Sequence, residues 1–214
     1  MNVWEFILAN RAEVGLRTLE HVVLVGASTA VAAGIGVPLG ILMSRRARLR
    51  KPILGVANVF QTIPSLALFG ILIPLPLIGG IGASTAIVAL VVYALLPIVK
   101  NTYTGIAGVE PGVLEAAKGV GMTSGQLLRM VELPLAIPVV LAGIRVATVI
   151  GVGVATIAAA IGAGGLGVFI FRGVATVNNT VILAGAIPAA LLALSIDGFL
   201  HLLERRLDWR ATVD

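Results

Sequence analysis

The 214-residue chain contains no cysteine, and only 12% of its residues are charged and 5% are aromatic. The lack of cysteine excludes disulfides, thiolate metal sites and cysteine nucleophiles. The sequence also lacks a Walker A motif, an HExxH motif, a GxSxG motif and any cluster of metal-ligating residues. It therefore offers no visible means of hydrolysing ATP or another substrate, and we expect no catalytic residues, no cofactor and no metal in this chain.

Apolar residues, in contrast, make up 58% of the chain and give a mean hydropathy of +1.08. This composition is far too apolar for an ordinary soluble domain and indicates an integral membrane protein. A helix needs about 20 apolar residues to cross the hydrocarbon core, and five stretches meet this requirement. They lie at about 21–43, 53–75, 84–100, 138–161 and 180–203. The sequence thus predicts an all-α membrane protein with about five transmembrane helices.

The basic residues fall mainly on one side of these predicted spans. The connection between the first two spans, residues 45–51, carries five cations, and further cations lie in the central loop and the tail. By the positive-inside rule these regions are cytoplasmic, which places the N-terminus outside and the C-terminus inside. We therefore divide the chain into an extracytoplasmic amphipathic segment (1–20), one transmembrane domain (21–203) and a cytoplasmic tail (204–214). The net charge of +5 then reflects topology and contact with membrane lipid, so we expect no binding to nucleic acid.

The longest polar interruption, EPGVLEAAKGVGMTSGQLLRMVELP, lies within the cytoplasmic loop 101–137 and predicts two short helices with a sharp bend between them. Pro111 suits the first turn of a helix, and the glycines that follow allow the backbone to turn left-handed and stop. Thr123 and Gln126 have the spacing of a capping box for the second helix. Pro134 marks the predicted end of that helix.

The first of these two helices carries small apolar side chains that another protein can approach closely, which predicts a docking surface. It resembles the EAA loop of ABC importer membrane subunits. The matching positions are Glu115, Ala116, Ala117, Gly121, Leu133 and Pro134. In that family the loop is cytoplasmic, and its short helix sits in a groove of the ATPase subunit. The resemblance implies a type I ABC importer fold like that of methionine importers, a location in the plasma membrane of a prokaryote, and a partner ATPase dimer that binds ATP and Mg.

The second predicted span carries a polar face that lipid would not tolerate. Four polar residues recur at positions i, i+3, i+4 and i+7 of this span: Asn58, Gln61, Thr62 and Ser65. Pro64 frees a backbone carbonyl beside them. Two interpretations stay open, namely that the face lines a translocation pathway or that it forms hydrogen bonds with a neighbouring helix.

Two ionisable residues, Arg145 and Asp197, lie within predicted spans at about the same distance from the cytoplasmic boundary. An intramembrane charge is costly unless it is paired, so we expect an ion pair between them. We interpret this pair as a structural tie near the inner leaflet in preference to a role in transport.

Residues 162–167 formally match GxGxxG, the fingerprint of dinucleotide binding. That fingerprint requires a preceding strand and an acidic residue about 20 positions further on, and neither is present here. We therefore reject dinucleotide binding. The glycines instead predict a turn at the outer surface, followed by a short helix at 168–174 that partly plugs the pathway.

Beyond the loop, the segments QTIPSLALFG, AGIR and IGAGGLG are similar to the permeases of osmoprotectant importers for glycine betaine, choline and carnitine. This resemblance implies uptake of a quaternary ammonium solute by alternating access. It also implies an extracytoplasmic substrate-binding protein and a second permease subunit, either identical or a close homologue. Related importers carry other solutes, such as ergothioneine or an amino acid like methionine, and the sequence does not separate these. A passive channel, an intramembrane enzyme and a membrane scaffold are the alternative classes, although a channel has no use for the EAA-like loop.

Overall fold

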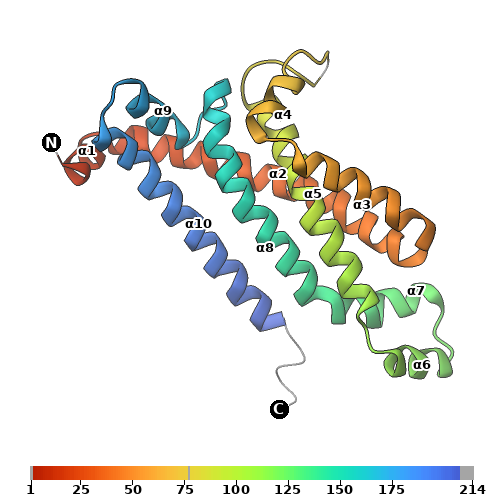
Figure 1. Cartoon of the computed structure of the whole chain (residues 1–214). Helices are drawn as coiled ribbons and strands as arrows, with labels where there is room; N and C mark the ends of the chain where they lie inside the picture. The colour runs from red at the N-terminus through yellow and green to blue at the C-terminus, as the bar shows by residue number, and fades with distance from the viewer. Residues whose placement is uncertain (1, 77, 208–214) are drawn as a thin grey trace.

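The structure is a computed structural model that describes residues 2–76 and 78–207, which form helices and turns without any strand among them (Figure 1). Four helical segments are long and apolar enough to cross a membrane: α2 (Arg11–Arg45), α5 (Ala83–Ala107), Ser124–Ile161, which contains α8 (Leu133–Ala158), and α10 (Asn179–Leu207). A fifth, broken segment consists of α3 (Ala47–Thr62) and α4 (Ser65–Leu72). The shorter helices are α1 (Val3–Ala9), α6 (Pro111–Gly119), α7 (Ser124–Gln126) and α9 (Gly167–Ala175). The predicted all-α architecture is therefore confirmed, with four to five spans where about five were predicted.

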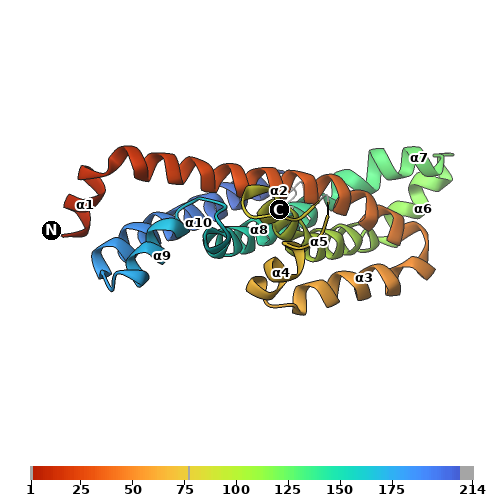
Figure 2. The ribbon, with the colours of Figure 1, turned by 90° about the horizontal axis from the view of Figure 1, so that it is seen from above.

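The helix α5 is central to the packing, because it lies against both α2 and α8. Small residues permit this close approach. A Cβ atom added to Gly40 of α2 would lie 2.5 Å from Thr102 of α5, and one added to Gly143 of α8 would lie 2.6 Å from Asn101. Such contacts matter in lipid, where helices gain little from hiding apolar surface and associate through close packing. Figure 2 shows α2 along one edge of the molecule and α3 and α4 along the other, with α5 and α8 between them.

The N-terminal segment predicted at 1–20 is not a single unit. Only α1 is separate, since α2 begins at Arg11 and runs without a break into the first span. Arg17 forms ion pairs with Glu13 at 3.9 Å and with Glu20 at 2.9 Å, at spacings of four and three residues, which stabilise these extra helical turns. At the other end of the chain, the predicted tail 204–214 is described only as far as Leu207, where α10 ends.

The second span differs most from its prediction, because it is not a continuous helix over 53–75. α3 ends at Thr62, α4 starts at Ser65, and the two helices meet at an angle of 101°. Ile63 and Pro64 between them adopt extended backbone conformations. The cause is Pro64, which disfavours helical geometry in the residue before it and cannot donate a backbone hydrogen bond.

Candidate functional site

The polar loop folds as two short helices with a tight turn between them, as predicted. Pro111 occupies the first turn of α6, and Gly121, just beyond this helix, has a φ of 85° in the left-handed region that favours glycine. Thr123 and Gln126 form the predicted capping box. The Thr123 amide donates to the Gln126 side chain at 2.8 Å, and the Gln126 amide donates to the Thr123 hydroxyl at 3.4 Å.

The second helix does not end at Pro134, contrary to the prediction. The helical segment continues from Ser124 to Ile161, so the loop and the fourth span form one rod. A π-helical turn, Leu127–Glu132, precedes the proline, and the Leu133 amide donates to the carbonyl of Leu128, five residues back. This wider turn relieves the clash that a proline ring makes with the carbonyl four residues before it, so the rod tolerates Pro134.

The two alanines of the loop have different surroundings. Ala116 is exposed together with Glu115, and Val120 at the end of α6 is 78% exposed. Ala117 is only 7% exposed, and its carbonyl accepts a hydrogen bond from the Met122 amide at 3.2 Å. The expectation that both alanines lie on the outer surface is therefore wrong for Ala117. This residue packs inside the loop, where a small side chain lets the chain turn back on itself.

An ion pair fixes the base of the loop to the end of α2. Glu132 is 4% exposed, and its carboxylate accepts hydrogen bonds from both terminal nitrogens of Arg45, one of them at 3.1 Å. Such a two-point contact between a guanidinium and a carboxylate fixes geometry as well as charge. This pair is not predicted from the sequence, where Arg45 serves only as a topology signal. The available clue was an acid, Glu132, directly before the apolar fourth span.

The predicted polar face of the second span does not exist as one surface, because the 101° bend separates Ser65 from the rest. Asn58 and Thr62 are exposed, whereas Gln61 and Ser65 are half-buried. The Thr62 hydroxyl donates to its own helix, at the carbonyl of Val59 (2.7 Å), and the Tyr93 hydroxyl donates to the Ile63 carbonyl at the bend. Within the described residues the Asn58 and Gln61 amides have no hydrogen-bond partner. They are therefore available to a solute or to a second subunit.

Arg145 and Asp197 do form an ion pair, which joins α8 to α10. Arg145 donates to the two Asp197 oxygens at 2.6 and 3.0 Å. It also lies 3.1 Å from Nδ1 of His201 and 3.4 Å from Glu204. One guanidinium therefore ties together three residues of α10, two of them acidic, which is a larger cluster than the predicted pair.

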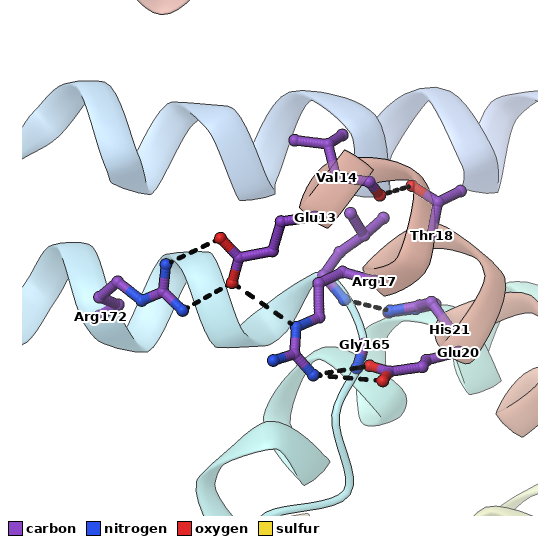
Figure 3. Close-up of polar contacts among 9 residues, drawn as sticks. Glu13, Val14, Arg17, Thr18, Glu20, His21, Gly165 and Arg172 are labelled. Atoms are coloured by element: carbon purple, nitrogen blue, oxygen red, sulfur yellow. Dashed lines mark hydrogen bonds and ion pairs between the residues drawn. The ribbon is translucent and has the colours of Figure 1, made fainter. Parts of the chain in front are cut away.

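A second polar network lies at the opposite end of the molecule, around the start of α2 (Figure 3). Glu13 pairs with Arg172 of α9 at 2.7 Å, and Arg17 pairs with Glu20 at 2.9 Å. Glu20 in turn accepts a hydrogen bond from the Gly165 amide at 2.8 Å. The hydrogen bonds that Arg172 donates to the Glu13 carboxylate raise the pKa of Arg172, so this guanidinium stays charged. Together these contacts hold the glycine-rich loop and α9 against α2.

His21 anchors the same loop from inside. It is fully buried, its Nδ1 accepts from the Leu166 amide at 3.3 Å, and its Nε2 lies 3.1 Å from the Val152 carbonyl. Gly164 has a φ of 83°, and a Cβ added there would lie 2.5 Å from the carboxylate of Glu20. Close approach thus requires glycine at three positions: Gly164 and Gly165 lie against Glu20 and His21 of α2, and a Cβ added to Gly167 would lie 2.0 Å from the Thr156 carbonyl oxygen of α8. The short helix predicted at 168–174 is confirmed as α9.

The fold and these sites define a multi-pass membrane protein that presents a short, rigidly held helix outside its spans. The chain belongs to the family described as "Binding-protein-dependent transport system inner membrane component", whose profile matches residues 36–209. It is 46% identical to the osmoprotectant import permease protein OsmW of Salmonella typhimurium over 206 residues, which cover 95% of this chain and 96% of that one. It is 51% identical to the glycine betaine/carnitine/choline transport system permease protein OpuCD of Bacillus subtilis over 177 residues, covering 82% and 76%.

The fold is similar to that of a chain of the MetNI methionine ABC transporter, solved in inward-facing conformations. The TM-score is 0.82 with 26% identity, over 91% of this chain and 96% of that chain. The resemblance to type I ABC importer permeases is thus confirmed, and the chain is a permease subunit of an ABC importer.

Proposed function

We propose that this permease subunit carries a quaternary ammonium osmoprotectant, of the glycine betaine, choline or carnitine type, into the cell. In this proposal a separate ATPase dimer docks on α6, a second permease subunit completes the pathway, and an extracytoplasmic binding protein delivers the solute. The N-terminus is outside and the C-terminus inside. Support for the solute comes from relatives at 46% and 51% identity that are named for osmoprotectant import and for glycine betaine, carnitine and choline transport.

The observation that carries the proposal is that the loop continues without a break into a membrane-spanning helix. α6 is exposed at Glu115 and Ala116, and the helical rod that follows it runs from Ser124 to Ile161. The Arg45–Glu132 pair attaches the base of this rod to α2. A displacement of α6 by a closing ATPase is therefore transmitted to two membrane helices as a rigid-body motion, which is the movement that alternating access requires.

The bend between α3 and α4 is the proposed contact with the passing solute. A quaternary ammonium group donates no hydrogen bonds and is held tightly by aromatic rings, yet only 5% of this chain is aromatic. Weak polar contacts favour release of the solute, because tight binding within the membrane slows transport. The unpartnered amides of Asn58 and Gln61, with Thr62 and Ser65 on either side of the bend, suit this role, and we assign them to the pathway.

The test is ATP hydrolysis and uptake by the complex of this permease with its ATPase and binding protein, reconstituted in proteoliposomes. We expect glycine betaine, choline or carnitine to stimulate hydrolysis and to accumulate inside only when ATP is supplied. Ergothioneine and methionine serve as competing solutes of different chemistry. Stimulation by methionine alone would reassign the substrate, and equilibration of solute without ATP would indicate a channel.

A further inference from the structure

An apolar groove of about 370 Å³ runs between α2, α3 and α5, on a part of the molecule that neither the docking loop nor the bend uses. Most of its wall comes from one stripe of α3 with helical spacing: Leu49, Pro52, Ile53, Val56, Ala57 and Phe60. Leu39 of α2 and three residues of α5 complete the wall, and every lining residue is apolar.

The groove has the length of one lipid leaflet. The twelve residues from Leu49 to Phe60 span eleven helical steps, which rise by about 16 Å at about 1.5 Å per residue. Half of a hydrocarbon core of about 30 Å is about 15 Å. A single acyl chain of a phospholipid in the leaflet where α3 begins therefore matches the groove from end to end.

Free cations lie where the headgroup of such a lipid would be. Five cations occupy the connection between α2 and α3, but two of them have partners in the protein. Arg45 binds Glu132, and the guanidinium of Arg50 lies 4.8 Å from the ring centre of Tyr103. Arg46 and Arg48 are exposed and have no partner among the described residues.

Position in the chain places these two arginines at the end of the groove. Arg48 lies in the first turn of α3, four residues before Pro52, and Arg46 is the N-cap residue directly before the helix, so both lie at the N-terminal end of the apolar stripe. Lys51 is also exposed, but it projects from a different side of α3. The first amides of α3 add to the attraction, because Arg46 at its N-cap provides no side-chain acceptor.

From the groove and these cations we infer a binding site for one anionic phospholipid. Its acyl chain lies along α3, and its phosphate contacts Arg46, Arg48 and the N-terminus of the helix. A second copy of the chain fits this surface less well. Helices that associate within membranes use small residues at their contact, whereas five of the six α3 residues in this wall are larger than alanine.

The test uses the complete permease–ATPase complex, with a fluorophore on a single cysteine introduced into this cysteine-free chain. Val56 lines the groove and is 58% exposed, so Val56→Cys carries the label. Leu194 of α10 is 69% exposed and lies outside the groove, so Leu194→Cys is the control position. The complex is placed in vesicles that contain either phosphatidylglycerol or phosphatidylethanolamine with brominated acyl chains, and quenching is followed against the fraction of brominated lipid.

At Val56 we expect brominated phosphatidylglycerol to quench at a lower fraction than brominated phosphatidylethanolamine, whereas Leu194 shows no preference. Arg46→Gln and Arg48→Gln should each raise the required fraction of phosphatidylglycerol about fivefold, the effect of one cation near an anionic surface. Lys51→Gln removes the same charge from the same helix and should have a clearly smaller effect. Co-elution of the ATPase with each variant verifies that the complex is intact.

Three outcomes overturn the inference. Equal quenching by the two lipids at Val56 means that the groove holds bulk lipid without selection. An equal effect of Lys51→Gln and Arg48→Gln means a diffuse surface charge and no defined site. Protection of Val56 from both lipids, together with a cross-link between two copies of the chain at this cysteine, means that a second subunit covers the groove.

Discussion

Two buried polar residues with defined partners determine where the loops of this protein lie. Glu132 holds the base of the polar loop that contains α6 through Arg45, and His21 holds the glycine-rich loop through the Leu166 amide. Both residues are at most 4% exposed. A buried polar group that loses its partner keeps its desolvation cost, so such residues hold their loops in one position.

The Arg45–Glu132 pair permits a double-mutant test at the residue scale. Arg45→Met leaves the buried Glu132 carboxylate without its donor and should lower stability by about 1–3 kcal/mol. It should also weaken the coupling of ATP hydrolysis to transport, because the loop loses its attachment to α2. Arg45→Met combined with Glu132→Leu should recover part of the stability, since no unpaired group is left.

The measurements for this pair are the apparent melting temperature of the purified permease and the ratio of solute transported to ATP hydrolysed. Arg129→Met is the matched control, because it removes an exposed cation from the same loop. Equal melting temperatures for Arg45→Met and Arg129→Met would contradict the assigned role of the pair.

At the scale of elements, the effect of a proline on its helix depends on the backbone around it, as the bend and the loop show. Pro64 breaks the second span, but Pro134 lies inside a continuous rod because a π-helical turn precedes it. Sequence patterns predict the loop helices and the capping box correctly, since these depend on neighbouring residues. They do not distinguish a proline that ends a helix from one that a widened turn accommodates, because that depends on the packing of the whole segment.

The different burial of Ala116 and Ala117 predicts two different defects. Ala116→Trp adds bulk to an exposed position, so it should block docking of the ATPase while the permease stays folded. We expect its affinity for the ATPase to fall at least tenfold, which corresponds to about 1.4 kcal/mol. Ala117→Trp adds the same bulk inside the loop, so it should destabilise the loop itself.

Binding of the purified ATPase to each variant, together with limited proteolysis of the loop, separates these two defects. Ala116→Trp should bind poorly but resist proteolysis as the unaltered permease does, whereas Ala117→Trp should be cleaved faster. Normal ATPase binding by Ala116→Trp would show that α6 is not the docking helix.

The bend predicts a labelling pattern in single-cysteine variants. A water-soluble thiol reagent should react with cysteines at positions 58, 61 and 62 if this end of α3 faces an aqueous pathway, and position 65 should react independently because it lies beyond the bend. Labelling should change when ATP is trapped, since the pathway then opens to the other side. Position 57, which is 9% exposed, is the buried control. Uniform protection at 58, 61, 62 and 65 would indicate a packing interface.

For the whole molecule, composition and the positions of apolar stretches are enough to predict the fold class and the number of spans, because a membrane demands long apolar helices. The ion pair of Arg145 with Asp197 is predictable for the same reason, since lipid strongly disfavours a single charge. The pair of Arg45 with Glu132 is not, because both residues lie outside the predicted apolar spans, where nothing in the sequence indicates that a charge is buried and needs a partner. Nor does the sequence reveal that α2 extends outward to contact α9 through Glu13, a contact between residues 159 positions apart.

The orientation of the chain in the membrane follows from charge and predicts opposite labelling of its two ends. The basic connection between α2 and α3 and the exposed helix α6 lie at the same end of the molecule, because Arg45 at the end of α2 contacts Glu132 in the loop. The positive-inside rule predicts that this end is cytoplasmic and that α1 and α9 lie outside. Cysteines placed at Leu8, which is 68% exposed, and at Val120, which is 78% exposed, report on the two sides of this naturally cysteine-free chain. In intact cells an impermeant thiol reagent should label position 8 and leave position 120 unlabelled until the membrane is permeabilised. The reverse pattern would place α6 outside, where no ATPase can reach it, and would contradict both the topology and the docking role of the loop.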